Sequence, residues 1–213
     1  MTYVASRPVL ITEGHGDVSS VPCLVRRIGE AKQQFELVPL VPPIRCGGLS
    51  KLKRPDELNR FVALAALREN RDSILIAIDC DDGCAKEEVL EFITRLKPMA
   101  ERFQVKIAVS FFVREFESLF LHCLPELAAK FPDLEIIPHP NLDVTKIEDI
   151  RNAKGYLGRQ MRRGSYKPTR DQASFVYALD LQKLTHQSRC FRHLSSCIDF
   201  LRDAGSGLVY PVI

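Results

Sequence analysis

Residues 74–83 read ILIAIDCDDG, an apolar run that ends abruptly in a cluster of acids. The segment ILIAI (74–78) shows no alternation of apolar and polar side chains. A strand of this kind is buried on both faces, as in a parallel sheet that is covered by helices. The flanking sequence agrees, because a helix opened by Pro55 is predicted near 55–70 and a second helix at about 85–102.

Three further apolar runs alternate with helical segments in the first half of the chain. They are PVLIT (8–12), FELVPLV (35–41) and VKIAVSFFV (105–113), and a helix from about Ser19 to Ala31 separates the first two. Repeated alternation of strand and helix predicts an α/β sheet of parallel strands joined by right-handed crossovers.

The length of 213 residues fits one compact domain with a small appendage. From about residue 118 the pattern is helical and rich in loops. We therefore expect a parallel-sheet core with helices on both faces in residues 1–120. Residues 121–213 are expected to form a helical, basic C-terminal region that packs on this core as a cap. No apolar run reaches the length of a membrane-spanning helix and the first residues do not resemble a signal peptide, so we expect a soluble cytoplasmic protein without a membrane partner.

The seven cysteines are irregularly spaced and include no CxxC pair, which argues against a disulfide framework and favours a reducing compartment. The nearest approach to a metal-binding pattern is Cys190, His193 and Cys197, with His186 just upstream. Zinc sites favour tighter paired spacings. We expect instead an amphipathic C-terminal helix whose cysteines are small core residues.

Acidic side chains follow three of the predicted strands. They are Glu13 and Asp17 after the first strand, Asp79, Asp81 and Asp82 after ILIAI, and Glu115 and Glu117 after residues 105–113. In an open parallel sheet, ligands bind beyond the carboxyl ends of the strands. Carboxylates gathered there repel one another unless a cation is bound, and oxygen ligands suit Mg²⁺ or Mn²⁺ better than zinc. The sequence therefore predicts a divalent-cation site.

The segment 151–192 is strongly basic, with ten Lys and Arg residues and two acids. The whole chain carries a net charge of only +3, so the remainder is acidic. A surface that binds along the phosphate backbone of a nucleic acid needs a basic segment of this kind. A solvated helical face gives the same count, and the sequence alone leaves both interpretations open.

The acids in LITEGHGD and LIAIDCDD resemble the TOPRIM signature, which topoisomerases, DnaG-type primases and OLD-family nucleases share. A closer resemblance is to a bacterial TOPRIM-like family, a domain of unknown function related to OLD-type nucleases. The motifs that carry it run from Glu13 to Leu194 and are EGHGD, IDCDDGC, VREFESLFL, DIRNAKGYL, YKPTRDQ, ALDL and RCFRHL.

The resemblance implies a compact TOPRIM core, a Mg²⁺ site and phosphodiester chemistry. By position, Glu13, Asp79 and Asp81 match the TOPRIM acids, and Glu115 and Glu117 match the acidic motif of the closer family. Relatives often act with an SMC/ABC-type ATPase in defence against phage. This chain has no GxxxxGK[ST] motif, so such an ATPase would be a separate partner.

We therefore expect a metal-dependent nuclease, the effector of a two-component ATPase–nuclease defence system. One or two Mg²⁺ or Mn²⁺ ions would activate a water molecule and orient a phosphate. The expected metal ligands are Glu13, Asp79, Asp81 and Glu117. The expected catalytic residues are Glu13, Asp79, Asp81, Glu115 and Lys154, and the expected nucleic-acid contacts are Arg162, Arg163, Lys167, Arg170 and Arg189.

Several alternatives stay open. The chain could be a non-catalytic subunit that binds nucleic acid or an ATPase and retains an acidic site. Four apolar residues followed by DxDD also resemble the first motif of haloacid-dehalogenase-type phosphatases, in which Asp79 would be the nucleophile. The Asp-Gly-Cys that follows departs from the pattern of that family. Tyr166 could be a nucleophile or a packing residue. DNA and RNA are equally open as substrates, and a homodimer is the commonest default.

Overall fold

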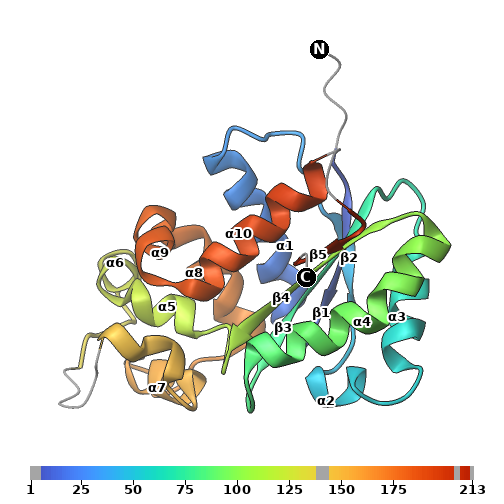
Figure 1. The fold of residues 1–213 in the computed structure, drawn as a ribbon. Helices are drawn as coiled ribbons and strands as arrows, with labels where there is room; N and C mark the ends of the chain where they lie inside the picture. Colours follow the sequence, from blue (N-terminus) through green and yellow to red (C-terminus); the bar gives the residue numbers. More distant parts are fainter. Residues whose placement is uncertain (1–5, 138–143, 204–206, 212–213) are drawn as a thin grey trace.

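The computed structural model describes residues 6–137, 144–203 and 207–211. Within these ranges five strands form one sheet, all parallel, in the order β2-β1-β3-β4-β5 (Figure 1). The strands are β1 (Pro8–Thr12), β2 (Leu40–Arg45), β3 (Ser73–Cys80), β4 (Lys106–Val113) and β5 (Val209–Tyr210). The predicted α/β class and parallel sheet are confirmed.

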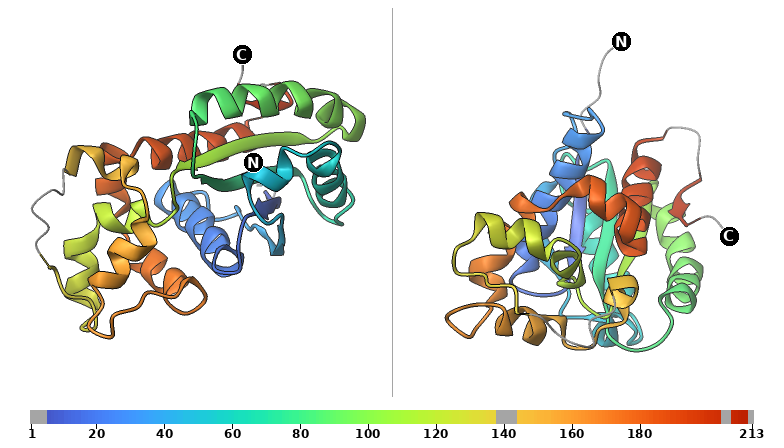
Figure 2. Two further views of the ribbon diagram at one scale, coloured as in Figure 1. Left: turned by 90° about the horizontal axis from the view of Figure 1, so that it is seen from below. Right: turned by 90° about the vertical axis from the view of Figure 1, so that its left-hand side faces the viewer.

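Helices cover both faces of the sheet (Figure 2). One face is covered by α1 (Asp17–Ala31) and α10 (Arg189–Arg202), and the other by α3 (Glu57–Ala66) and α4 (Ala85–Phe103), with the short α2 (Leu49–Leu52) beside them. Side chains of a strand alternate between the two faces. In β3, Leu75 and Ala77 therefore join the first cluster, whereas Ile74, Ile76 and Ile78 join the second. All eight residues of β3 are buried, as ILIAI predicts.

The second strand lies further along the chain than predicted. It spans Leu40–Arg45 rather than 35–41, and it contains Pro42 and Pro43, which directly follow the predicted run. A proline lacks the N–H that a sheet requires, but an edge strand tolerates this on its open side. Because β2 is the edge of the sheet and pairs only with β1, the two prolines fit inside it.

The C-terminal half contributes helices beyond the carboxyl ends of the strands, at the left of Figure 1. They are α5 (Ser118–His122), α6 (Leu124–Lys130), the 3₁₀ helix η1 (Val144–Asp149), α7 (Ala153–Arg159), the π-helix η2 (Pro168–Gln172), α8 (Ala173–Ala178) and α9 (Leu181–Gln187). A row of edge-to-face aromatic rings joins them to the sheet. Phe112 of β4 contacts Phe116 at 4.8 Å between ring centroids, and Phe120 lies 5.6 Å from both Phe116 and Phe175.

The chain then returns to the sheet through α10 and β5. The predicted amphipathic helix is confirmed, and Cys190 and Cys197 lie on its buried side. The Val113 N–H donates to Cys190 Sγ at 3.2 Å, and the Cys197 thiol donates to the Val109 carbonyl at 3.5 Å. The two cysteine side chains therefore form hydrogen bonds with backbone groups of β4. Strand β5 was not predicted, because two residues show no periodicity.

Among residues 6–137, 144–203 and 207–211, no helix combines the length and the hydrophobicity that crossing a lipid bilayer requires.

Candidate active site

The candidate site lies where the path of the chain through the sheet reverses. From β1 the chain moves outward to β2, then crosses back to β3 on the other side of β1. Neighbouring loops part at such a switch point and leave a crevice beyond the strand ends, which is the usual binding position in open α/β sheets. Glu13 directly follows β1, and Asp79 is the penultimate residue of β3.

A cavity of about 210 Å³ occupies this position. Its lining residues are Glu13, Gly14, His15, Gly16, Asp17, Asp79, Glu117, Lys154, Pro168, Thr169 and Gln172. The structure thus brings together four of the predicted site residues, Glu13, Asp79, Glu117 and Lys154. Asp81 and Glu115 do not line the cavity.

Glu117 is the most unusual side chain of the cavity. It is fully buried at the start of α5, and neither of its carboxylate oxygens has a hydrogen-bond partner. Burial raises the pKa of Glu117 to about 7, although the nearby Lys154 ammonium lowers it. Buried polar atoms almost always have partners, so an unsatisfied carboxylate that lines a cavity points to a ligand.

Asp79 lies beside Glu117, because its side chain shares the face of β3 that Leu75 and Ala77 occupy. Its Oδ1 accepts a hydrogen bond from the Phe116 N–H at 2.8 Å, which fixes the carboxylate relative to the end of β4. Burial raises the pKa of Asp79, and the negative charge of Glu117 raises it further.

Lys154 supplies the positive charge between these two acids. Its Nζ lies 3.6 Å from Asp79 Oδ2 and 3.6 Å from Glu117 Oε2. Burial of the ammonium lowers its pKa, but Glu117 and Asp79 raise the pKa by more, so the group stays charged. Lys154 is the second residue of α7, and Asn152 caps this helix by accepting from the Gly155 N–H at 2.9 Å.

Glu115 reaches the site indirectly. Its Oε2 accepts from the backbone N–H of Lys154 at 2.8 Å. The Glu115 carboxylate therefore lies against the first turn of α7 and not in the cavity lining.

Glu13 lies on the other side of the cavity, against the loop after β2. A Cβ at Gly48 would lie 3.4 Å from Glu13 Oε1, and Gly48 has a φ of +105°, which favours glycine. Burial raises the pKa of Glu13, and the charges of Asp81 and Asp17 raise it further. A raised pKa makes a carboxylate a stronger base, which suits a group that accepts a proton.

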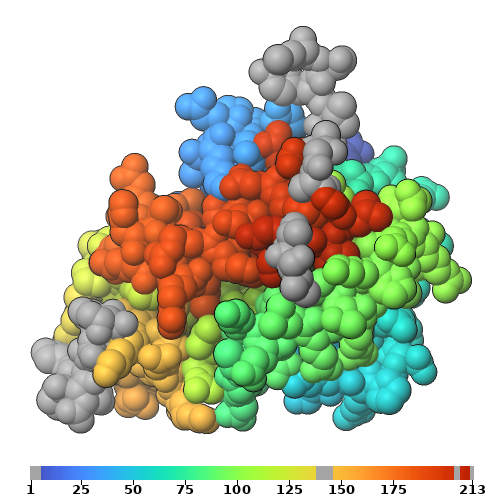
Figure 3. All heavy atoms as spheres, viewed as in Figure 1, coloured from blue at the N-terminus to red at the C-terminus, as the bar shows by residue number. Residues whose placement is uncertain are grey.

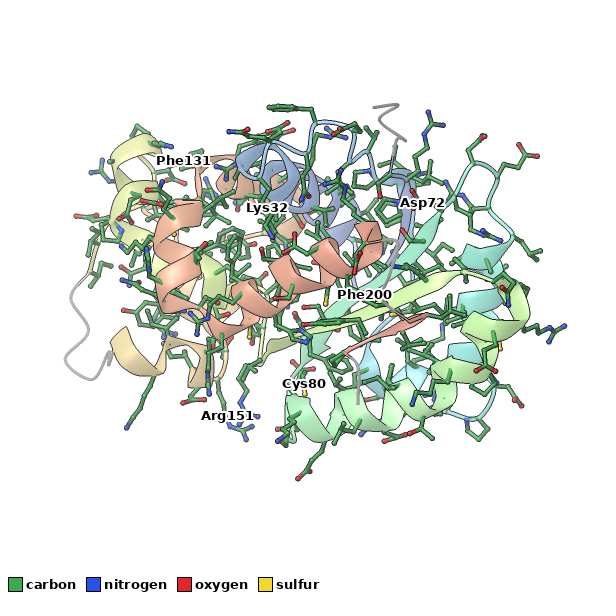
Figure 4. All side chains as sticks on the ribbon, turned by 45° about the horizontal axis from the view of Figure 1, so that its top comes forward. Lys32, Asp72, Cys80, Phe131, Arg151 and Phe200 are labelled. Atoms are coloured by element: carbon green, nitrogen blue, oxygen red, sulfur yellow. The ribbon has the colours of Figure 1, made fainter. Side chains whose placement is uncertain are left out.

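Asp81 is an exposed residue at the rim. Its charge acts on Glu13, and its backbone carbonyl accepts from Arg114 Nη1 at 2.5 Å. The next residue, Asp82, pairs with Arg151 at 2.9 Å. Arg151 and Cys80, both labelled in Figure 4, accordingly lie at the same edge of the molecule. The two acids of the DxD pattern thus occupy different environments, one buried and one exposed.

Asp17 and Gln172 line the cavity, although they were not among the predicted site residues. Asp17 Oδ2 accepts from the Gly14 N–H at 2.7 Å, and Asp17 Oδ1 accepts from Gln172 Nε2 at 3.0 Å. Gln172 comes from η2, 155 positions further along the chain. Gln172 belongs to the motif YKPTRDQ and Asp17 to the motif EGHGD. Neither motif predicts that these two side chains are in contact.

Tyr166 packs beside the site. Its ring centroid lies 6.3 Å from that of Phe120 and 6.0 Å from that of Phe175. Its hydroxyl is buried without a hydrogen-bond partner, and burial together with Glu117 strongly raises the pKa of the phenol. This environment favours the packing interpretation over a nucleophile.

Four of the five predicted nucleic-acid contacts have an acidic partner within the fold. Arg163 and Arg170 both pair with Asp171, each at 2.8 Å. Arg162 lies 3.7 Å from Glu135, and Lys167 has an exposed side chain. Arg189, at the start of α10, pairs with buried Glu148 at 3.1 Å and lines a different cavity. Much of the basic charge in 151–192 is therefore used within the fold.

The donor set consists of oxygen atoms, which suit a hard divalent cation, because the unsatisfied atoms that line the cavity are carboxylate oxygens of Glu13 and Glu117 and the amide oxygen of Gln172. Among the described residues, no three His, Cys, Asp or Glu side chains converge closely enough to hold a metal by themselves. Mg²⁺ commonly keeps several water molecules and binds through one or two carboxylates together with substrate phosphates. A partial protein ligand set is compatible with that mode of binding.

Fold and site together define an α/β protein with an acidic cavity at the switch point of a parallel sheet. Comparison with protein-family models, with curated proteins and with solved structures finds no match to this chain.

Proposed function

We propose that this protein is a metal-dependent phosphodiesterase that cleaves nucleic acid, with a TOPRIM-like core. The observation that carries the proposal is the buried, unsatisfied Glu117 carboxylate, which lines one cavity with Asp79, Glu13 and Lys154. The matches of Glu13, Asp79 and Asp81 to the TOPRIM acids support the same chemistry.

We assign the residues of the site different roles in the proposed reaction. Asp79 and Glu117, with Glu13, would hold Mg²⁺ or Mn²⁺, which supplies Lewis acidity and lowers the pKa of a water molecule when bound. As an alternative to binding the metal, Glu13 would act as the general base that accepts the proton of the attacking water, and burial raises the pKa of this carboxyl group. Lys154 offsets the negative charge that develops on the phosphate oxygens. Asp81 is exposed and lies outside the cavity lining.

The resemblance to OLD-type relatives supports a partner as well. We infer that the protein acts in the cytoplasm with an SMC/ABC-type ATPase, in defence against phage. A homodimer fits the same role. DNA and RNA remain alternative substrates, and the experiment below distinguishes them.

A second candidate function is a non-catalytic binding subunit. The observation that favours it is the position of Lys154, whose ammonium already neutralises Asp79 and Glu117 without a metal. A protein that kept the acids for stability alone would have this arrangement.

Cleavage assays distinguish the two functions. Purified protein is incubated with plasmid DNA, single-stranded DNA or total tRNA in Mg²⁺, Mn²⁺ or EDTA. Asp79→Asn and Glu117→Gln test the cavity, and Glu135→Gln, a surface carboxylate outside it, is the matched control. Cleavage that requires metal and is lost only in the cavity variants is the expected result. Absence of cleavage on every substrate, with and without the ATPase partner, would favour the binding subunit.

A further inference from the structure

A second and larger cavity, of about 680 Å³, lies between the first turns of α4 and α10. Figure 3 shows these two helices side by side on one face of the molecule, α4 in green and α10 in red. The lining residues are Gly83, Cys84, Ala85, Lys86, Val89, Leu90, Phe111, Val113, Arg114, Asp149, Arg189, Cys190, His193 and Pro211. This volume falls in the range of small-molecule pockets.

The cavity exists because the sheet ends unevenly on this side. Strand β4 has eight residues, but β5 pairs only with Ile107 and Ala108. Within the described residues, the rest of the β4 edge has no neighbouring strand on that side. Phe111 and Val113 therefore form an apolar floor, and Val89 and Leu90 of α4 form an apolar wall.

The rim of the cavity is cationic. Lys86, Arg114 and Arg189 line it, and Asp149 is the one acid among its lining residues. Arg114 Nε is buried without a hydrogen-bond partner. Arginine and lysine are the side chains that recognise phosphate groups, and arginine does so with two parallel hydrogen bonds.

This cavity has no lining residue in common with the candidate active site, but the segment that ends β3 connects the two, because Asp79 lines the first cavity and Gly83 lines the second. Arg114 has a φ of +63° directly after β4, an uncommon left-handed conformation. Its guanidinium donates to the Asp81 carbonyl at 2.5 Å and lies 3.8 Å from Asp82. The loop from Asp81 to Gly83 therefore faces Glu13 on one side, through the charge of Asp81, and the second cavity on the other.

We propose that the second cavity binds one nucleotide unit, with its base against the apolar floor and its phosphate against Arg114, Lys86 and Arg189. The inference rests on the proposed function, since it assigns the cavity to the nucleotide next to the scissile bond. An apolar floor with a cationic rim complements a flat, uncharged base attached to an anionic phosphate. A free mononucleotide carries a phosphomonoester dianion and a nucleotide within a single strand carries a phosphodiester monoanion, so the two share the base and an anionic phosphate but differ in charge.

The test is calorimetric titration in EDTA, so that cleavage plays no part. The probes are dAMP and dTMP, the matching nucleosides, inorganic phosphate, and a short single-stranded oligonucleotide. Leu90→Trp fills the cavity, and Leu64→Trp places the same ring on the exposed face of α3 as its control. Lys86→Ala removes a rim charge, and Lys97→Ala removes an exposed charge on the same helix outside the cavity.

We expect a mononucleotide to bind the wild-type protein more tightly than its nucleoside or inorganic phosphate. Leu90→Trp abolishes this binding, and Lys86→Ala weakens it about tenfold through the loss of one charge-assisted contact. The two control variants bind as the wild type does. Failure of every mononucleotide to bind, or binding that Leu90→Trp leaves unchanged, overturns the proposal.

The two proposals fail separately. If Asp79→Asn abolishes cleavage and no mononucleotide binds, the proposed active site is supported and the proposed nucleotide pocket is contradicted. If mononucleotides bind and no substrate is cut, the pocket stands as a nucleotide site and the nuclease proposal falls. Tighter binding of the oligonucleotide than of either mononucleotide identifies a strand as the source of the nucleotide.

Discussion

The backbone N–H of Lys154 donates to Glu115 Oε2 at 2.8 Å and so joins the first turn of α7 to the residues that follow β4. The ammonium of Lys154 reaches Asp79 and Glu117 from this anchored turn. The position of the cation in the cavity therefore depends on a carboxylate outside the cavity.

Glu115→Ala is expected to lower activity without removing any residue that lines the cavity. Loss of an acceptor at a helix start costs about 0.5–2 kcal/mol of stability and leaves α7 free to shift. Glu115→Gln keeps an acceptor oxygen and should recover most of the cleavage rate. Cleavage kinetics and thermal unfolding of both variants make the comparison. Equal loss of activity in the two variants would contradict the positioning role.

Glu117→Gln is expected to stabilise the protein in EDTA at pH 8. The folded pKa of Glu117, about 7, lies above its ordinary value of 4.5, so the folded state holds the proton more tightly than the unfolded state. Its contribution to stability is complete below pH 4.5 and is lost as the pH rises through 7. The variant should therefore gain a few kcal/mol relative to wild type at pH 8 and little at pH 4.5.

Chemical denaturation of both proteins across this pH range measures the difference. Asp79 and Lys154 face the Glu117 carboxylate, so Glu135→Gln, an exposed carboxylate 3.7 Å from Arg162, serves as a control outside the buried cluster. A stability difference that does not change with pH would show that Glu117 titrates normally.

Mg²⁺ or Mn²⁺ is expected to raise the melting temperature of the wild-type protein but not that of Asp79→Asn. A ligand that binds only the folded state adds about 2.7 kcal/mol at one hundred times its Kd. Differential scanning fluorimetry over a metal series measures the shift, and Ca²⁺ provides a comparison of ionic size. An equal shift in the variant would place the bound metal elsewhere.

Gly16→Ala is expected to be destabilising, whereas Gly14→Ala is tolerated. A Cβ at Gly16 would overlap Gln172 Oε1 and lie 2.5 Å from Pro168 Cβ, so η2 would have to move away from α1. Overpacking of this kind typically costs about 1–3 kcal/mol. At Gly14 the nearest atom is Asp17 Oδ2 at 3.5 Å, an ordinary contact. Thermal unfolding of the two variants gives the comparison, and equal stability would contradict the close packing of η2.

Lys167→Ala is expected to weaken nucleic-acid binding and to reduce the slope of log Kd against log salt by about one. Its side chain is exposed, whereas Arg163 and Arg170 are paired with Asp171. Arg163→Ala should instead lower thermal stability. Binding isotherms at several salt concentrations test this, and an unchanged slope in Lys167→Ala would exclude the residue from the interface.

The central strands and the acids that follow them could be predicted because each depends on its own stretch of sequence. ILIAI requires burial on both faces, and parallel strands place Glu13 and Asp79 at one edge. The partnership of Asp17 with Gln172 could not be predicted, since periodicity carries no information on contacts between distant segments. The prolines of β2 were misleading for a related reason, because only the sheet order reveals that β2 is an edge strand.

The same limit applies to the basic segment 151–192. A count of charges cannot distinguish Arg163, which pairs with Asp171, from Lys167, which faces solvent. The second cavity could not be predicted from the sequence either, since it arises from the unequal lengths of β4 and β5.

Both ends of the C-terminal region are attached to the same strand. Helix α5 follows β4 within a few residues, and β5 returns to pair with Ile107 and Ala108 of that strand. The intervening helices, including α7 with Lys154, are therefore enclosed between two attachments to β4, and the hydrogen bond from Gln172 to Asp17 attaches them to α1 as well. We expect that local unfolding which exposes Asp79 and Glu117 to water requires the loss of contacts to β4 and to α1 together.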